Sequence, residues 1–579
     1  MSVELRQTAR EWMSSDPDPV TRARVQAWLD SDDLDSLKEA FGARLQFGTA
    51  GLRGPIGPGP GAMNRALVRR VAAGLAQYLL DTVGDACQSG VVIGYDARHG
   101  SLEFAQDTAS VLADRGIPSR IFDEVVPTPR LAHAIVETQG CAGVMVTASH
   151  NPPGDNGYKV YWADGAQIVP PHDVGISAAI DGLTGFDPRE VGDYAAHCAS
   201  GRIGPVPASV TEDYFRRVQG LRVHRGSSLR IVYTAMHGVG TESVVRALNE
   251  AGYDDVHLVA EQAEPDGDFP TVAFPNPEEP GALDLSYAVA SRVQADLIVA
   301  NDPDADRLAV AVPDGSGGWR QFTGNQVGCL LADDLLTHGE SDGRTRLVAT
   351  TVVSSRLLSR IADAHGAAYT ETLTGFKWIA HAALKHEAVG GRFVLGYEEA
   401  LGYSAGDVAR DKDGVSAVLL FADLAAWCKS KGRSMVEHLT ALYRRYGVHS
   451  SVQRSIKLPG AEGRAQIDAA MHRLRSNPLT ELDGLRVVRF VDILARTITD
   501  PVTGAVRPYE LPPSNVLAWT LEDGSQVLAR PSGTEPKIKF YGEVREILAD
   551  SDTLQDGERR AIGRVNSLVS RLVNAADLA

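Results

Sequence analysis

Residues 141–161 read CAGVMVTASHNPPGDNGYKVY and join an apolar run to a polar loop. The run at residues 143–147 predicts a buried strand, and the two prolines that follow prevent the strand from continuing. The Asp-Asn-Gly after them favours a turn. Ser149 therefore lies at a strand end beside His150, where a hydroxyl can act as a nucleophile or carry a phosphoryl group. The alternative is a capped turn without chemistry.

Composition limits the classes of protein to which the chain can belong. Its 579 residues, 44% hydrophobic and 23% charged, predict several globular domains. A net charge of −17 argues against nucleic acid or an anionic membrane as a partner. Five cysteines without a CxxC pair favour a reducing, cytoplasmic location over a disulfide framework. We also expect neither a signal peptide nor a membrane-spanning segment.

Strand and helix patterns alternate along most of the chain. Apolar runs at residues 91–95, 119–122 and 143–147 are separated by helical patterns, and the same order recurs over 229–300 and 347–395. This predicts an α/β protein with three consecutive βαβαβ-type domains, whose mixed, mostly parallel sheets are covered on both faces. Each third strand leads into a polar loop. Because ligands bind outside the carboxyl ends of such strands, we expect the loops to meet around a central cleft.

Four domains follow from this pattern and from its breakdown near residue 450. Domain I covers residues 1–223, with two short N-terminal helices and the serine loop. Domain II covers 224–318 and domain III covers 319–449. The final domain, 450–579, has short alternating strands and is predicted to be α+β.

Asp302, Asp304 and Asp306 follow the apolar strand of the second repeat. Three carboxylates this close repel one another unless a cation neutralises them. Oxygen ligands suit Mg²⁺ or Ca²⁺, but an EF-hand would need glycine at Arg307 and a carboxylate at Pro313. We therefore expect Mg²⁺ holding a phosphate, with a solvated acidic turn as the alternative.

A second anion site is predicted in the last domain. Arg530, Ser532, Gly533 and Thr534 combine a guanidinium fork, two hydroxyls and a flexible backbone within one strand and turn. Phosphate is the expected ligand. A hairpin with a surface arginine is the alternative.

Three further stretches carry candidate polar groups, two of them on loops that contain glycines. The loop at residues 47–55 can bring backbone N–H groups to an anion beside Arg53, and its GPGPG continuation excludes a dinucleotide-binding fingerprint. Glu398 and Glu399 can accept hydrogen bonds from sugar hydroxyls or can lie at a helix N-terminus. Lys159 can polarise a phosphoryl group or move a proton, or it can be a surface lysine.

Taken together, TASHNP, DPDADR, GYEEALG and RPSGTEPK resemble the motifs of the α-D-phosphohexomutase superfamily, the phosphoglucomutases and phosphomannomutases. The resemblance extends from Phe47 to about Tyr541. It implies four domains around a central cleft, a phosphoserine, Mg²⁺, and a sugar bisphosphate as activator.

The resemblance also implies a role for each motif. Ser149 carries the phosphoryl group and, with Asp302, Asp304 and Asp306, binds Mg²⁺. The other implied positions are His150, Lys159 and Arg53 for proton transfer and phosphate contacts, and Arg307, Lys377, Glu398, Glu399, Arg530, Ser532, Gly533 and Thr534 for substrate binding.

We therefore predict an isomerase that interconverts sugar 1-phosphates and 6-phosphates, or 5-phosphates, through a phosphoserine and a sugar bisphosphate. Its partner is a small sugar phosphate, and it is a monomer or homodimer. Hexose-specific members usually carry Gly-Glu-x-Ser in the sugar loop, whereas this chain has Tyr397 and Ala400 at the glycine and serine positions. The loop is more similar to the branch with phosphopentomutases and sugar-bisphosphate synthases. The alternatives are therefore a phosphopentomutase or a sugar-1,6-bisphosphate synthase beside a phosphoglucomutase or phosphomannomutase.

Overall fold

The computed structural model describes residues 2–48, 51–225, 228–532 and 537–578. The chain forms two compact units, which are Met1–Gly324 with Ala400–Ser430 and Asn325–Glu399 with Lys431–Ala579. Among the described residues, no helix is both long enough and apolar enough to cross a membrane.

Three helices, rather than the two predicted, precede the first sheet. They are α1 (Ser2–Ser15), α2 (Pro19–Asp30) and α3 (Leu34–Phe41). The side chain of Asp33 accepts a hydrogen bond from the backbone N–H of Ser36 and so begins the third helix. The prediction of two helices is wrong, because the three helices are separated only by short connections. Ala9, Val25 and Leu37 form the buried contact among the three.

The first sheet has the strand order β1-β5-β4-β2-β3-β6. Its central strands are parallel, whereas β5 runs antiparallel to both β4 and β1. The strands are β1 (Leu52–Pro55), β2 (Val91–Tyr95), β3 (Ser119–Ile121), β4 (Ala142–Val146), β5 (Asp155–Trp162) and β6 (Ile203–Pro205). The accompanying helices are α4 (Arg65–Thr82), η1 (Gly84–Ser89), α5 (Ser101–Asp114), α6 (Thr128–Glu137), α7 (His172–Gly182), α8 (Tyr194–Ala199) and α9 (Ala208–Gly220).

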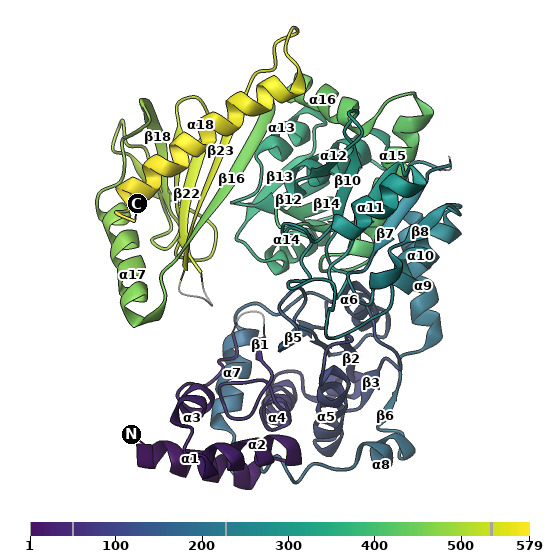
Figure 1. Ribbon diagram of the computed structural model, residues 1–579, viewed down its shortest axis with the longest axis vertical. Coiled ribbons are helices and arrows are strands. Elements are labelled where there is room, and N and C mark those ends of the chain that lie inside the picture. The colour runs from purple at the N-terminus through teal and green to yellow at the C-terminus, as the bar shows by residue number, and fades with distance from the viewer. Residues whose placement is uncertain (1, 49–50, 226–227, 533–536, 579) are drawn as a thin grey trace. The chain divides into compact units, whose positions relative to one another are not determined.

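Helices cover both faces of this sheet (Figure 1). Val91, Ile93 and Val144 belong to a core that includes residues of α4 and α5. Val92 and Met145, which alternate with them, belong to a separate core with residues of α6. Because successive side chains point to opposite faces, burial on both sides explains why these strands are apolar at every position.

The second sheet, also in the first unit, has the order β11-β10-β9-β7-β8. Its strands are β7 (Ile231–Thr234), β8 (Val256–Leu258), β9 (Leu297–Ala300), β10 (Ala309–Pro313) and β11 (Trp319–Phe322). The helices of this part are α10 (Gly240–Glu250), η2 (Ala260–Gln262), α11 (Asp284–Val293) and α15 (Gly414–Ser430). The almost entirely buried α15 follows β15 (Gly402–Ala405) and packs against α10 and β9.

The second unit contains a parallel arrangement in which β12 (Arg346–Thr351) lies between β13 (Ala368–Thr372) and β14 (Arg392–Glu398). Its helices are α12 (Gly324–His338), α13 (Leu357–Ala364), α14 (Phe376–Ala388) and α16 (Met435–Tyr446).

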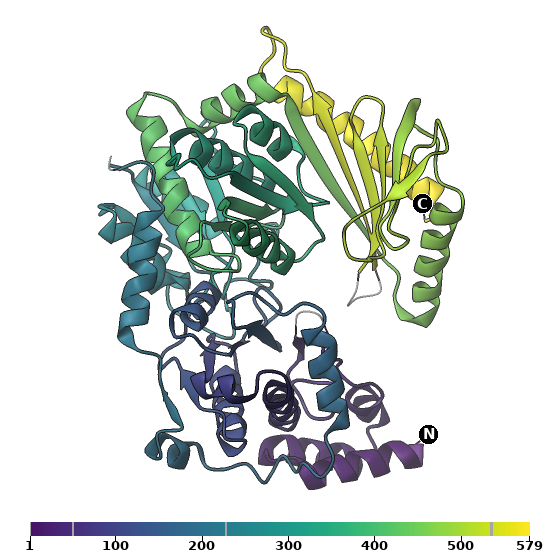
Figure 2. The same ribbon diagram turned by 180° about the vertical axis from the view of Figure 1, so that it is seen from behind.

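The C-terminal part of the same unit is an antiparallel sheet of order β16-β23-β22-β21-β18-β19-β20, with β17 paired to β18. The long helix α18 lies along this sheet, as both views show (Figures 1 and 2). The elements are β16 (Val448–Lys457), α17 (Gly460–Ser476), β17 (Glu481–Leu482), β18 (Leu485–Asp492), β19 (Thr497–Thr499), β20 (Val506–Pro508), β21 (Leu517–Leu521), β22 (Gln526–Pro531), β23 (Lys537–Glu546) and α18 (Leu554–Ala575).

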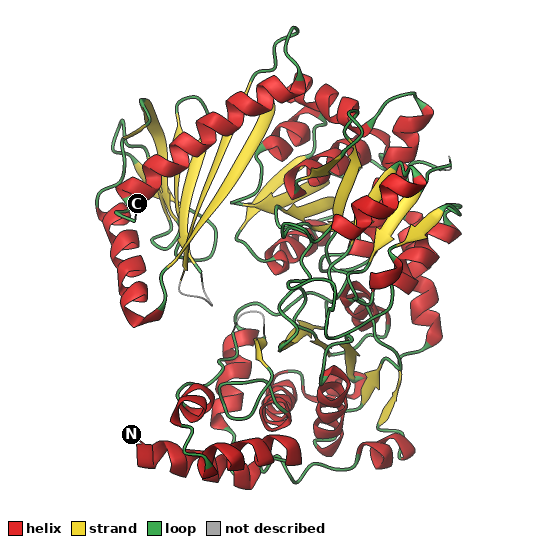
Figure 3. Ribbon diagram, viewed as in Figure 1, coloured by secondary structure: helices red, strands yellow, loops and turns green. Residues whose placement is uncertain are grey.

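The three predicted repeats share one topology. In each, the first strand lies between the other two, in the orders β3-β2-β4, β8-β7-β9 and β13-β12-β14. Helices alternate with strands throughout these repeats, whereas most strands of the last sheet follow one another without a helix between them (Figure 3). The predicted fold class, three mixed, mostly parallel α/β parts followed by a sheet-rich C-terminal part, is confirmed. The domain boundaries at 223, 318 and 449 and the central cleft stay predictions.

The prediction of a turn at residues 155–157 is wrong, because these residues begin strand β5. Asn156 donates a hydrogen bond to the carbonyl oxygen of His99, and the N–H of Thr147 donates to the carbonyl of Gly157. These long-range contacts outweigh the local turn preference of Asp-Asn-Gly. As a result, Lys159 lies within a strand.

Candidate active site

Ser149 lies just beyond β4 with a backbone φ of 52°, a left-handed conformation that is rare for serine. Buried Arg98 holds the loop in this shape, because its guanidinium donates to the carbonyl oxygens of Ser149, Asn151, Pro152 and Asp155. Sequence reasoning missed Arg98, since it belongs to no motif and lies 51 positions before Ser149.

The hydroxyl of Ser149 faces the acidic loop that follows β9. Its Oγ donates to Asp302 Oδ2 at 2.7 Å and lies 3.2 Å from His150 Nδ1. Arg53 donates to Asn151 Oδ1 at 3.1 Å. The structure thus brings the predicted residues Arg53, Ser149 and His150 to one place beside Asp302.

Asp302, Asp304 and Asp306 each direct one oxygen into a group whose members lie within 4.8 Å of one another. All three side chains are at most 1% exposed. Lys159 Nζ donates to Asp304 Oδ2 at 2.7 Å and to Asp306 Oδ2 at 3.1 Å, and Lys412 Nζ lies 3.1 Å from the same Asp306 oxygen. Oδ1 of Asp304 and Oδ1 of Asp306 are buried and accept no hydrogen bond from the described residues. Such orphaned carboxylate oxygens fit a divalent cation.

The pKa shifts of Asp302 and Asp304 also favour a bound cation. Burial, followed by the charges of Asp304 and Asp306, raises the pKa of Asp302 well above its ordinary value. Burial alone would also raise the pKa of Asp304, but Lys159 and the hydroxyl of Thr128 outweigh it and hold the pKa low. Asp302 is therefore the carboxylate whose charged form is least favoured by its surroundings, and a cation bound beside it would favour that form.

Arg307, the last residue of the acidic motif, also lies against the trio. Its backbone N–H donates to Asp302 Oδ1 at 3.1 Å, and its Nε lies 3.8 Å from Asp302 Oδ2. Two other residues at this site were not predicted. Thr128 donates to Asp304 Oδ2 at 2.8 Å, and Lys412 comes from the segment before α15. Neither belongs to a motif, and only the fold brings them to the aspartates.

Gly414 packs directly against the acidic loop. A Cβ at this position would lie 2.5 Å from the carbonyl oxygen of Arg307, 2.6 Å from Asn301 Nδ2 and 2.7 Å from the carbonyl oxygen of Ala305. We expect Gly414→Ala to lower the free energy of unfolding by about 1–3 kcal/mol, because the loop backbone must shift.

Urea unfolding of Gly414→Ala beside Gly220→Ala tests this expectation, because an added Cβ at Gly220 meets no atom within 4 Å. The control should be neutral or slightly stabilised. Equal stability of the two variants would contradict the close packing described for Gly414.

The second unit brings together another set of predicted residues. Glu398, at the end of β14, accepts a hydrogen bond at 2.7 Å from the backbone N–H of Gly375, just before α14. Arg530 of β22 donates to the hydroxyl of Thr374. Lys377 is buried in the first turn of α14. A carboxylate and a guanidinium group thus meet the loop at residues 374–375, directly before the helix that carries the ammonium group of Lys377.

Glu399 and Tyr397 differ in what they contact. Ser354 donates to Glu399 Oε2 at 2.9 Å and accepts from the Glu399 backbone N–H at 3.1 Å. Tyr397 is fully buried, and its hydroxyl donates to the carbonyl oxygen of Ser355 at 3.3 Å. Tyr397 is therefore a core residue that supports the loop.

The predicted phosphate loop is only partly described. The backbone N–H of Ser532 donates to the carbonyl oxygen of Lys537 at 2.8 Å. Gly533 and Thr534, both predicted to bind phosphate, lie outside the described residues.

Comparison with family descriptions accounts for most of the chain. Residues 44–184 match "Phosphoglucomutase/phosphomannomutase, alpha/beta/alpha domain I". Residues 212–317 match domain II of the same description, and residues 323–446 match domain III.

Several proteins are similar over nearly their whole length. A "Probable phosphomannomutase" of Haemophilus influenzae is 42% identical, with 83% of this chain and 93% of the relative covered. A "Phosphopentomutase" of Mus musculus is 36% identical, covering 95% and 92%. A "Phosphoglucomutase" of Staphylococcus epidermidis is 37% identical, covering 90% and 95%. The crystal structure of a "putative phosphomannomutase" from Thermus thermophilus matches with a TM-score of 0.67 at 23% identity, covering 92% and 99%, and supports the fold.

Proposed function

Because the chain belongs to the phosphoglucomutase/phosphomannomutase family of isomerases, we propose that it moves a phosphoryl group between two hydroxyls of one sugar phosphate. Ser149 is the proposed carrier. The observation that supports this best is the 2.7 Å hydrogen bond from Ser149 Oγ to buried Asp302. A serine held against an acidic trio in this way fits a phosphoryl carrier better than a capped turn.

The proposed reaction has two transfers. In the first, the bond between phosphorus and Ser149 Oγ breaks, and a bond forms between phosphorus and a free sugar hydroxyl oxygen, giving a sugar bisphosphate. In the second, the other phosphoryl group of the reoriented bisphosphate returns to Oγ, which releases the isomeric monophosphate. A sugar bisphosphate from solution would phosphorylate an empty Ser149 by the same second step.

Each transfer also moves one proton. In the first transfer, the proton lost by the attacking sugar hydroxyl ends on the freed Ser149 Oγ. In the second, Oγ loses that proton as it attacks phosphorus, and the freed sugar oxygen gains it. His150 and Lys159 are the candidate groups, and His150 Nδ1 lies 3.2 Å from Ser149 Oγ. Lys159 donates to Asp304 and Asp306 and neutralises charge beside the reacting serine. Arg53, bonded to Asn151, is proposed to contact the phosphoryl group.

Asp302, Asp304 and Asp306 are proposed to hold Mg²⁺. When bound, the ion would neutralise charge that develops on the transferring phosphoryl group. The two carboxylate oxygens that accept no hydrogen bond from the described residues support this assignment. Arg307 adds a further positive charge beside Asp302.

Residues of the second unit are proposed to recognise the rest of the substrate. Glu398 and Glu399 would accept hydrogen bonds from sugar hydroxyls. Arg530, Ser532 and Lys377 would bind the phosphate that is not being transferred, together with the predicted positions Gly533 and Thr534.

We expect Arg530→Gln to raise KM for the sugar monophosphate about tenfold or more, because a charge-assisted hydrogen bond to phosphate is lost. Steady-state kinetics provide the measurement. Arg507→Gln, an exposed arginine on β20 of the same unit, is the matched control and should leave KM unchanged. An unchanged KM in Arg530→Gln would argue against phosphate binding by this residue.

Glucose and mannose phosphates are our first candidate substrates, with pentose phosphates as the alternative. Relatives described as phosphomannomutase and phosphoglucomutase support the first, and relatives described as phosphopentomutase, with the Tyr397-Glu398-Glu399-Ala400 loop, support the second. Assaying glucose 1-phosphate, mannose 1-phosphate and ribose 1-phosphate side by side, with product analysis for bisphosphate, separates these activities. The proposal would be contradicted if the protein isomerised none of the three sugar phosphates.

A further inference from the structure

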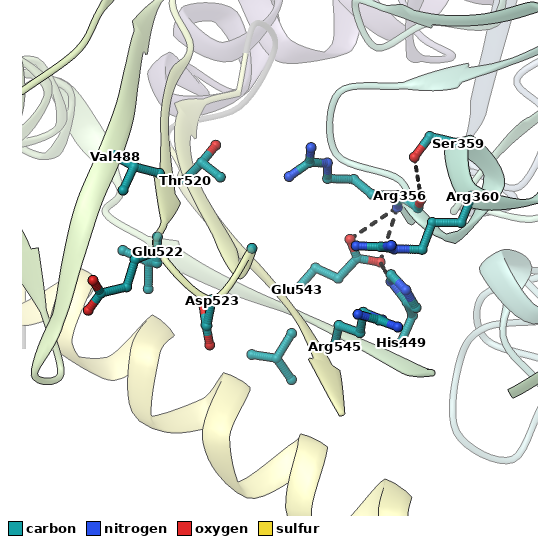
Figure 4. A pocket seen from close by; sticks show the side chains of 13 residues that line it. Arg356, Ser359, Arg360, His449, Val488, Thr520, Glu522, Asp523, Glu543 and Arg545 are labelled. Carbon is teal, nitrogen blue, oxygen red and sulfur yellow. Dashed lines mark hydrogen bonds and ion pairs between the residues drawn. The ribbon is translucent and has the colours of Figure 1, made fainter. Parts of the chain in front are cut away.

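A cavity of about 280 Å³ lies within the second unit, between α13 and the strands of the C-terminal sheet (Figure 4). Arg356 and Arg360 extend into it from the α13 side, toward strands that carry Thr520 and Glu543. None of the proposed sugar-binding or phosphate-binding residues lines it. The cavity is therefore separate from the proposed catalytic machinery.

The acidic residues at this cavity already have cationic or hydrogen-bonding partners. Glu522 pairs with Arg486, and Asp523 pairs with Arg564. Buried Glu543 accepts hydrogen bonds from the Ser355 hydroxyl and from the backbone N–H of Arg356, and it pairs with His449. Burial alone would raise the pKa of Glu543, but these partners hold it below its usual range.

Two arginines at the cavity, unlike its acidic residues, have side chains without such partners in the described part of the chain. Among the residues that the structure describes, the guanidinium groups of Arg356 and Arg360 form no hydrogen bond or ion pair. Arg545, on β23, also lines the cavity, but its Nε donates to the carbonyl oxygen of Tyr446. Burial, followed by the charge of Arg360, lowers the pKa of Arg545. Arg356 is half-buried and Arg360 is exposed, and the acidic side chains at the cavity are bonded to other groups, which favours an anion as the ligand of these two arginines.

We propose that this cavity binds a small phosphate-bearing anion through the guanidinium groups of Arg356 and Arg360, with the hydroxyl of Thr520 as an additional donor. Guanidinium groups present a planar pair of donors that matches phosphate oxygens. The volume, near the lower limit for ligand pockets, suits inorganic phosphate or a short phosphate ester better than a nucleotide.

Titration calorimetry with inorganic phosphate on the full-length protein tests this site. All three proteins compared carry Arg530→Gln, which removes the proposed substrate-phosphate contact, so the result does not depend on the catalytic proposal. In that background, adding Arg356→Gln and Arg360→Gln should weaken phosphate binding by about tenfold or more. Adding Arg433→Gln and Arg454→Gln, two exposed arginines of the same unit, is the charge-matched control and should leave binding unchanged.

Two results would overturn the proposal. One is phosphate affinity that is equal in the cavity variant and its parent, and the other is no measurable phosphate binding in the parent. As a check on separateness, Arg356→Gln with Arg360→Gln in the otherwise unaltered protein should keep sugar-phosphate turnover within about twofold. A loss of turnover greater than about tenfold would place the two arginines in the catalytic machinery instead.

Discussion

Ser149→Ala is expected to abolish mutase turnover, with kcat lowered by at least about 10⁴-fold. Without Oγ, no side-chain atom at the end of β4 can accept the phosphoryl group, so neither transfer can proceed through the protein. The loop itself should persist, because Arg98 holds it through backbone carbonyl oxygens that the substitution leaves in place. The loss should therefore reflect chemistry and not unfolding.

Two measurements separate these causes. Intact-mass spectrometry after incubation with a sugar bisphosphate should detect one added phosphoryl group on the unaltered protein and none on Ser149→Ala. Thermal unfolding should give similar midpoints for both. Ser200→Ala removes an exposed hydroxyl, which donates to the carbonyl of His197, and serves as the control. Normal turnover in Ser149→Ala would refute the phosphoserine assignment.

Asp302→Asn should weaken Mg²⁺ binding by about tenfold or more and lower turnover by about 10³-fold. The amide keeps the shape of the side chain but removes one negative charge from the trio. It also replaces one of the two carboxylate oxygens that now accept hydrogen bonds from Ser149 and from the backbone of Arg307. Both the metal and the position of the serine hydroxyl should therefore be affected.

Titration of the metal-stripped protein with Mg²⁺, read by calorimetry, measures the first effect independently of activity. Asp254→Asn, at an exposed position before β8, is the matched control and should bind Mg²⁺ as the unaltered protein does. Unchanged Mg²⁺ affinity in Asp302→Asn would show that the trio is not the metal site. Unchanged affinity with lost turnover would leave Asp302 only the role of positioning Ser149.

Much of the fold was predictable because its signals are local. Strands buried on both faces are apolar at every position, as at β2 and β4, and the helices between them carry a regular apolar stripe. The polar loops after the third strands carry distinct residues, so Ser149, the three aspartates and Glu398 are recognisable from local sequence alone. The antiparallel strand β5 is not, because Asp-Asn-Gly locally favours a turn and only pairing with β4 and β1 makes it extended.

By itself, the sequence determined the alternation of strands and helices, the loops that carry chemistry, and the family to which those loops point. Only the tertiary structure placed Arg98 around the serine loop, Lys159 and Lys412 among the aspartates, and Gly414 against the acidic backbone. The physical reason is separation along the chain. Lys159 and Asp304 are 145 positions apart, so no local pattern records a contact that exists only once the sheets have packed.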